Sequence, residues 1–207
     1  MEIVEIKYKT NFFSTERTIV FSDESIEFYS EQNLLIRFKK EEIKDFRFGV
    51  KWITGIEFTI GRVYSVDIRN NKNEIIKVRL RSLYGINRNR LFKKYSGIIN
   101  NIYEHAFDEY VRKSCQEIEN GKTVTVSDIV FNSEGICIDP KKKNSLIKWD
   151  DLVVNKYTYY FTLASRKQPD FYKAFTFLTD WNSPVVFSIS ETILRDKKLQ
   201  PPHMCCE

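Results

Sequence analysis

Histidine and cysteine supply most catalytic bases, nucleophiles and metal ligands, and this chain has few of either. Its two histidines are His105 and His203, and its four cysteines are Cys115, Cys137, Cys205 and Cys206. A nucleophile–histidine–carboxylate device needs a histidine that the fold holds in place. Only His105 lies in a patterned segment, and its helical surroundings favour a surface or core role. We therefore expect no catalytic histidine.

Metal binding has one cue, the C-terminal run His203-Met204-Cys205-Cys206. Imidazole and thiolate ligands suit zinc or copper. The run follows Pro201 and Pro202 at the end of the chain, where order is usually lost. We interpret residues 200–207 as a disordered tail, and we expect no metal and no cofactor.

Carboxylates could also do chemistry, since Glu5/Lys7 and Glu42/Lys44 place an acid and a base on one strand face. Solvated strand faces produce such pairs freely, and neither pair has the aspartate that a metal-dependent nuclease requires. Glycine patterns that cradle phosphates are missing. The sequence predicts a protein that is not an enzyme, with a carboxylate-based enzyme as a remote alternative.

Two clusters of basic side chains could attract an anionic partner. The first flanks the start of an expected helix and consists of Arg81, Arg88, Arg90, Lys93 and Lys94; the second is the loop run Lys141, Lys142 and Lys143. Helix N-termini favour anions, and each basic residue contributes about 1 kcal/mol near an anionic membrane. The alternative is a solvated charged surface.

Aromatic residues gather between residues 157 and 181. Tyr159 and Tyr160 lie on opposite faces of one expected strand, and a sheet that is apolar on both faces is covered or makes contacts. We expect the linker helix or another chain to cover part of this sheet. The candidate apolar contact surface consists of Tyr157, Tyr159, Tyr160 and Trp181.

The elements that must position these residues can be read from the periodicity. Apolar and polar residues alternate in the first 82 residues, as in the pair 63–68 and 76–80 around an Asn-rich turn. This pattern predicts half-buried antiparallel hairpins. From Asn87 to about Asn120 the spacing becomes three and four, which predicts one long helix. Asn87 or Asn89 could cap its start, Gly121 could end it, and a kink is expected near Gly97.

Strand patterning resumes at Lys122. A helix from Glu191 to about Lys198 should end before Pro201 and Pro202, and Trp181–Pro184 should form the turn before the last strand. The expected strands are 123–131, 136–138, 146–149, 157–163, 171–178 and 185–189. Each half of the chain thus reads as several antiparallel strands followed by a helix, long in the first half and short in the second.

One short stretch of the chain occurs twice. Residues 19–28 (IVFSDESIEF) match residues 129–138 (IVFNSEGICI), and residues 35–38 (LIRF) match residues 146–149 (LIKW) one residue out of step. A self-match at a fixed offset indicates a duplicated unit. We predict a domain at residues 1–107, a helical linker at residues 108–121 and a second domain at residues 122–207.

A strand bundle closed by a C-terminal helix resembles the bacterial pleckstrin-homology-like (PH-like) families. Two details carry the resemblance: the Glu-x-Ile-x-apolar runs at residues 24–28 and 134–138, and the run Leu146–Leu152, which is similar to their I-x-W-x-D-I segment. The first copy of that segment, Ile36–Ile43, has two extra residues and Phe in place of Trp. The resemblance implies a mainly β, α+β fold: two PH-like antiparallel barrels or sandwiches in tandem, with the long first helix bridging them.

The resemblance also implies binding rather than catalysis. PH-like modules hold lipid headgroups, peptides or partner domains, but the fold does not fix which. The turns at residues 22–25 and 132–135 are acidic, so they would repel the phosphates that some members bind. We favour a scaffold that binds another protein, itself included; the alternative is peripheral binding of an anionic membrane or acidic ligand.

Composition sets the remaining limits. The net charge is +5, which lacks the concentrated basic face of a nucleic-acid-binding module. The N-terminus does not have the order of a secretion signal, and no apolar run reaches the roughly 20 residues of a membrane span. The cysteine spacing suggests no disulfide framework. We expect a cytoplasmic protein.

Overall fold

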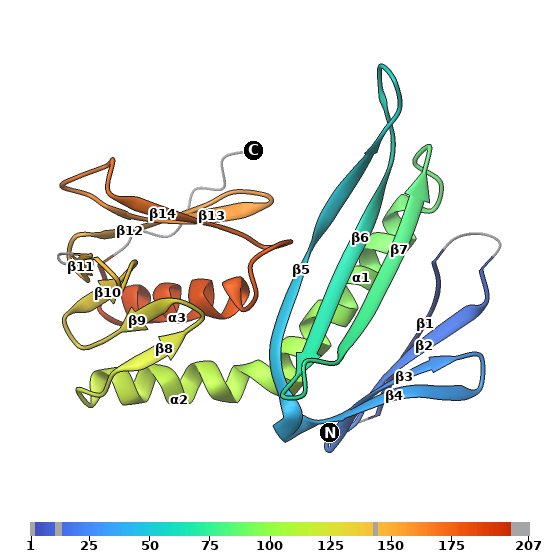
Figure 1. Cartoon of the computed structure of the whole chain (residues 1–207), viewed down its shortest axis with the longest axis horizontal. Coiled ribbons are helices and arrows are strands. Elements are labelled where there is room, and N and C mark those ends of the chain that lie inside the picture. Colours follow the sequence, from blue (N-terminus) through green and yellow to red (C-terminus); the bar gives the residue numbers. More distant parts are fainter. Residues whose placement is uncertain (1–2, 11–13, 143–144, 200–207) are drawn as a thin grey trace. The chain divides into compact units, whose positions relative to one another are not determined.

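The computed structural model describes residues 3–10, 14–142 and 145–199. The chain is mixed α+β with mostly β-sheet (Figure 1), which confirms the predicted class. It divides into two compact units between Asp108 and Glu109, here called unit 1 and unit 2. Each unit is described by itself. No helix among the described residues combines the length and apolarity needed to cross a bilayer.

Unit 1 contains two antiparallel sheets and a helix. The first sheet has the order β1 (Val4–Lys9), β2 (Glu16–Phe21), β3 (Ser25–Ser30) and β4 (Asn33–Lys39). A 3₁₀ turn, η1 (Lys40–Glu42), leads to the second sheet of β5 (Ile43–Thr54), β6 (Thr59–Asn70) and β7 (Ile75–Leu83). Helix α1 (Arg88–Ile102) follows and packs on β6, β7 and β1 (Figure 1). Tyr95 of α1 stacks on Tyr64 of β6, with ring centroids 5.1 Å apart.

Unit 2 repeats this order with shorter strands. Its first sheet contains β8 (Val124–Val126), β9 (Ile129–Phe131), β10 (Gly135–Cys137) and β11 (Leu146–Lys148). Its second sheet contains β12 (Leu152–Lys156), β13 (Tyr160–Ser165) and β14 (Tyr172–Thr176), and α3 (Ser183–Asp196) follows. The ring of Phe187 on α3 meets Phe161 of β13 edge-on, at 5.3 Å between centroids. Neither unit closes into a barrel in its described residues, because each keeps two separate sheets.

Strand register shows that the two copies are equivalent. Phe21 pairs with Ile26 across the β2–β3 turn, and Phe131 pairs with Ile136 across the β9–β10 turn. On the other side, Phe21 faces Val4 and Phe131 faces Val124. Both phenylalanines are 0% exposed. The residues that match in sequence therefore fill the same place in each unit.

The second part of the sequence match is out of register by two residues. Ile26 pairs with Phe38, whereas Ile136 pairs with Ile147, so Phe38 corresponds to Ile147 and not to Trp149. The backbone N–H of Lys40 donates to the Glu24 carbonyl and that of Trp149 to the Glu134 carbonyl, so Lys40 holds in unit 1 the position that Trp149 holds in unit 2. Shifting an alignment of two strands by two residues keeps every side chain on the same face of the sheet, so the sequence match preserved the buried face although its register was wrong. The two extra residues expected in the first copy are absent.

The last expected strand is wrong, because residues 185–189 lie in α3. That run of valines and isoleucines fits a strand locally, but Pro184 lies in the first helical turn, where its missing N–H costs nothing. Val185, Val186, Ile189 and Ile193 are all buried at helical spacing. Thus Trp181–Pro184 starts a helix, and α3 is neither short nor limited to 191–198. Strand β12 was missed.

The predicted long helix is confirmed, but its irregular turn lies at Tyr103–Phe107 and not near Gly97, where a kink was expected. Helix α1 runs through Gly97 to Ile102, and a π-helical turn, η2 (Tyr103–Phe107), links it to α2 (Asp108–Glu119). Asn87 holds the N-cap position without a capping side-chain hydrogen bond. Gly121 is left-handed at φ +79°, as a helix-ending glycine should be. Helix α2 buries Val111, Cys115 and Ile118.

Candidate functional site

The described residues contain no group of three or more His, Cys, Asp or Glu side chains that could hold a metal ion. The tail run His203–Cys206 lies outside the described residues. Of the two Glu/Lys pairs, Glu5 and Lys7 form an exposed ion pair at 3.3 Å. Glu42 instead accepts the backbone N–H of Lys39 at 3.1 Å, at the start of η1. Both carboxylates therefore have surface structural roles.

His105 is a core residue of the π-helical turn. It is 2% exposed, and its Nε2 has no hydrogen-bond partner among the described residues. Burial lowers the pKa of His105 below its ordinary value of 6.5, and the nearby charge of Lys40 lowers it further, while Asp23 acts in the opposite direction. The imidazole is therefore neutral inside the fold.

This burial predicts a loss of stability in mild acid. Above pH 6.5 the imidazole is neutral in both states, but below it only the unfolded chain takes up a proton, until the lower folded pKa is reached. The free energy of unfolding should then fall by at most about 1.4 kcal/mol per pH unit. Urea unfolding at about pH 7.5 and about pH 5.5 should show a steeper loss for wild type than for His105→Gln. Equal slopes would contradict a buried neutral imidazole.

A cavity of about 630 Å³ lies in unit 1, where the ends of β1 and β7 meet the start of α1. Two backbone features position its walls. The N–H of Arg81 donates to the Thr10 carbonyl at 3.1 Å, which ties β7 to the end of β1. The chain then turns through left-handed Tyr84 and Gly85 into α1. The lining residues are Tyr8, Lys9, Glu16, Arg81, Leu83, Ile86, Asn87, Arg90, Leu91 and Lys94. We call this the unit 1 cavity.

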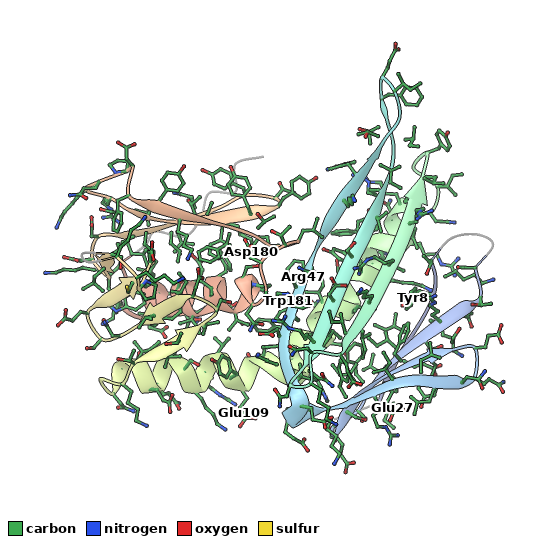
Figure 2. All side chains as sticks on the ribbon, viewed as in Figure 1. Tyr8, Glu27, Arg47, Glu109, Asp180 and Trp181 are labelled. Atoms are coloured by element: carbon green, nitrogen blue, oxygen red, sulfur yellow. The ribbon has the colours of Figure 1, made fainter. Side chains whose placement is uncertain are left out.

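Tyr8, labelled in Figure 2, is the buried polar side chain of this cavity. It is 2% exposed, and its hydroxyl has no hydrogen-bond partner of ordinary geometry in the described structure. Burial raises the pKa of Tyr8, against the charge of Arg17, a side-chain hydrogen bond with Arg17 and the charge of Arg79, so the phenol stays protonated at neutral pH. The Arg17 side chain can donate to its oxygen, but its proton has no acceptor among the described residues.

The charge of the cavity wall is strongly positive. Lys9, Arg81, Arg90 and Lys94 contribute four cations, and Glu16 contributes one carboxylate. Lys94 Nζ donates to the Lys7 carbonyl, which fastens α1 to β1. Burial lowers the pKa of Lys94, and the charge of Arg90 lowers it further, whereas Glu16 raises it. Arg90 and Lys94 are therefore close enough to repel each other.

The structure separates the predicted basic residues into different places. Arg81, Arg90 and Lys94 line the unit 1 cavity, whereas the exposed Arg88 and Lys93 do not. In the β10–β11 loop of unit 2, Lys141 and Lys142 are exposed, and Lys142 pairs with Asp139 at 3.4 Å. Lys143 lies outside the described residues. Sequence reasoning missed Tyr8, Lys9 and Glu16; the alternation in β1 would have placed Tyr8 on a buried face.

A second feature is the sheet face of β12–β14 that points away from α3, here called the unit 2 outer face. Phe161 and Leu163 of β13 are buried on the inner face of the sheet, so the residues that alternate with them lie on the outer face. The face consists of Val153, Asn155, Tyr160, Thr162, Ala164, Tyr172, Ala174 and Thr176, as the cross-strand pairs show. None of these side chains is buried and none is charged. The described residues leave this uncharged face uncovered.

The corresponding face of unit 1 is different. Strands β5–β7 carry ion pairs on that face: Arg47 and Arg79 each pair with Asp67, at 3.1 and 2.6 Å. Arg69 pairs with Asp45 at 2.6 Å. The two copies thus share a sheet order but differ in the chemistry of one face. Because the shared fold does not require an uncharged face, its presence in unit 2 is specific to that copy.

The predicted aromatic surface is only partly on this face. Tyr160 lies on it, and the Tyr157 ring stacks on Tyr160 with 4.5 Å between centroids. Tyr159 lies on the other face of the sheet, and its carbonyl accepts the backbone N–H of Phe177. Trp181 is half-buried just before α3, outside the three strands. The predicted contact surface did not include Tyr172, which is 57% exposed. Tyr157 and Tyr160 are 48% and 40% exposed, so the linker helix does not cover these two side chains, and cover of the sheet by another chain stays a prediction.

Comparison with protein-family models, curated proteins and solved structures finds no match to this chain.

Proposed function

We propose that the protein is a non-catalytic interaction module built from two PH-like domains, and that it binds a protein partner on the unit 2 outer face. The proposal of PH-like domains is supported by the repeated order of a four-stranded sheet, a three-stranded sheet and a helix. The equivalent registers of Phe21 and Phe131 support a common origin of the units. PH-like modules are binding domains, so the resemblance favours a scaffold over an enzyme.

The observation that carries the docking proposal is the uncharged unit 2 outer face. Solvent-facing sheet residues are usually polar or charged, as on β5–β7 of unit 1. Interface centres are depleted in charge and enriched in tyrosine, and Tyr160 and Tyr172 stand at the ends of this face, 40% and 57% exposed. Small residues between them, such as Ala174, leave a surface that a partner can approach closely. The partner should present a flat, largely uncharged surface.

A charge at the centre of this face should abolish docking. Ala174 is exposed and pairs with Thr162 on the central strand, so Ala174→Arg adds a cation without disturbing the core. A desolvated, unpaired charge at an interface costs about 2 kcal/mol or more, which corresponds to at least a roughly 30-fold loss of affinity. Affinity capture from lysate of the source cells, followed by mass spectrometry, would identify a partner whose binding can be titrated.

Thr125→Arg is the matched control, because Thr125 is an exposed strand residue on the other sheet of unit 2. A partner retained by wild type and Thr125→Arg but lost by Ala174→Arg supports the docking face. Light scattering should be run on the same proteins, because the partner can be a second copy. A strict monomer that captures nothing, or a partner retained by Ala174→Arg, contradicts the proposal.

A further inference from the structure

We propose that the unit 1 cavity binds a small ligand that carries a phosphate monoester on an apolar body. This site is separate from the proposed docking face, which belongs to unit 2. The ligand chemistry follows from four features of the cavity wall: its charge, a buried hydroxyl whose proton has no acceptor among the described residues, the start of α1 and its apolar residues.

The charge selects an anion. Four cations face one carboxylate, and that carboxylate, Glu16, lies opposite Lys9 in the β1–β2 register. Arg81, Arg90 and Lys94 therefore remain as an excess of positive charge. Burial and Arg90 already disfavour the charged form of Lys94. A dianion in the cavity would relieve this repulsion, and a phosphate monoester is close to a dianion at neutral pH.

The Tyr8 hydroxyl supplies a neutral donor next to these cations. Buried hydroxyls almost always have a partner, because an unmade hydrogen bond inside a protein is costly. Among the described residues the Tyr8 proton has no acceptor, although the Arg17 side chain can donate to the Tyr8 oxygen, and Arg17 Nε and Thr10 Oγ1 are also without a partner there. A phosphate oxygen would accept the Tyr8 proton and satisfy the most buried of these groups.

The start of α1 points to the same charge. Helix N-termini carry partial positive charge and usually have acidic residues in the first turn. The first turn of α1 has no acidic residue, and its N-cap, Asn87, makes no capping hydrogen bond. Arg88 and Arg90 lie in this turn instead, an arrangement that is unfavourable for the helix alone. An anion beside Asn87 and Arg90 would compensate for it.

The apolar wall accounts for the body of the ligand. Leu83, Ile86 and Leu91 line the cavity together with the charged residues. Its volume of about 630 Å³ exceeds what an isolated phosphate needs and falls in the usual range for small-molecule sites. The same headgroup chemistry occurs in soluble phosphate monoesters and in phosphatidic acid.

Titration calorimetry of the full chain with phenyl phosphate and with inorganic phosphate, at low salt, tests the site. We expect phenyl phosphate to bind more tightly than inorganic phosphate. Arg90→Gln and Tyr8→Phe should each weaken phenyl phosphate by about tenfold or more, since each removes a donor to a charged group. Lys93→Gln, which changes an exposed lysine outside the cavity, should leave affinity within about twofold.

Tyr8→Phe has a second readout. Because it deletes a buried hydroxyl whose proton has no acceptor among the described residues, the ligand-free variant should have a Tm equal to or above that of wild type, while the rise in Tm caused by phenyl phosphate should shrink. A ligand-free Tm below that of wild type would show that the hydroxyl already has a stabilising partner, and would overturn the inference.

Flotation with phosphatidylcholine vesicles containing phosphatidic acid distinguishes the two sources of the ligand. Binding to these vesicles that Arg90→Gln abolishes assigns the site to a lipid headgroup. Phenyl phosphate binding without flotation assigns it to a soluble monoester. The proposal fails if neither probe binds, or if Arg90→Gln and Lys93→Gln weaken both probes equally, since that result indicates unspecific charge attraction. Neither outcome depends on a protein partner, so the docking proposal stands or falls separately.

Discussion

Phe131→Ala should lower the free energy of unfolding of unit 2 by about 3–5 kcal/mol, and Phe21→Ala should do the same for unit 1. Both side chains are 0% exposed, so truncation removes their buried area and leaves a cavity. Each occupies the same register position in its sheet. Equal costs are therefore expected if the two copies use one packing scheme.

Hydrogen exchange measured by mass spectrometry is the suitable readout, because unfolding of a two-unit chain need not be two-state. The largest loss of protection should fall within the mutated unit. Val20→Ala and Val130→Ala are matched controls, since each changes a half-buried valine on the same strand next to the phenylalanine. They should cost less than about 1 kcal/mol. A cost below this for Phe131→Ala would show that the two positions are not equivalent.

Gly135→Ala should destabilise unit 2 by about 3 kcal/mol, at the upper end of the usual range for overpacking. A Cβ at this position would lie 2.1 Å from the Ile147 carbonyl oxygen and 2.8 Å from Lys148 Cα. Both are backbone atoms of the paired strand β11, so β10 and β11 would have to separate. Chemical denaturation and amide exchange in β9–β11 would measure the loss.

Gly97→Ala provides a control of opposite sign. Gly97 lies inside α1, and the nearest atom to its added Cβ would be Ile6 Cδ1 at 3.7 Å, an ordinary contact. Alanine is favoured over glycine within a helix by about 0.5–1 kcal/mol. The substitution should therefore raise the stability of unit 1. If both glycine substitutions destabilise equally, the steric argument for Gly135 is wrong.

Local periodicity explains how much of the fold could be predicted. The alternation before residue 82 and the helical spacing after Asn87 both correspond to observed elements. Where local signals were ambiguous, the prediction failed. The run 185–189 is rich in β-branched residues, so only its burial against the second sheet identifies it as helix. The match of residues 35–38 to 146–149 failed in register for a related reason, because a shift of two leaves the buried face unchanged.

The candidate sites were predicted less well than the elements. Charge clustering along the chain brought Arg81, Arg90 and Lys94 together, but it could not separate them from Lys93 on the same helix. Tyr8 joins them only because β1 meets β7 and α1 in space. Likewise, Tyr172 joins Tyr160 on one face only through the pairing of β13 with β14.

The sequence by itself determined that an antiparallel strand unit occurs twice and that a long helix divides the copies, because these features are encoded by neighbours within a few residues. The tertiary structure alone decided which side chains share a cavity and which sheet face lacks charge. Such arrangements depend on strand register and on helix packing, and both are set by contacts between segments far apart in the chain.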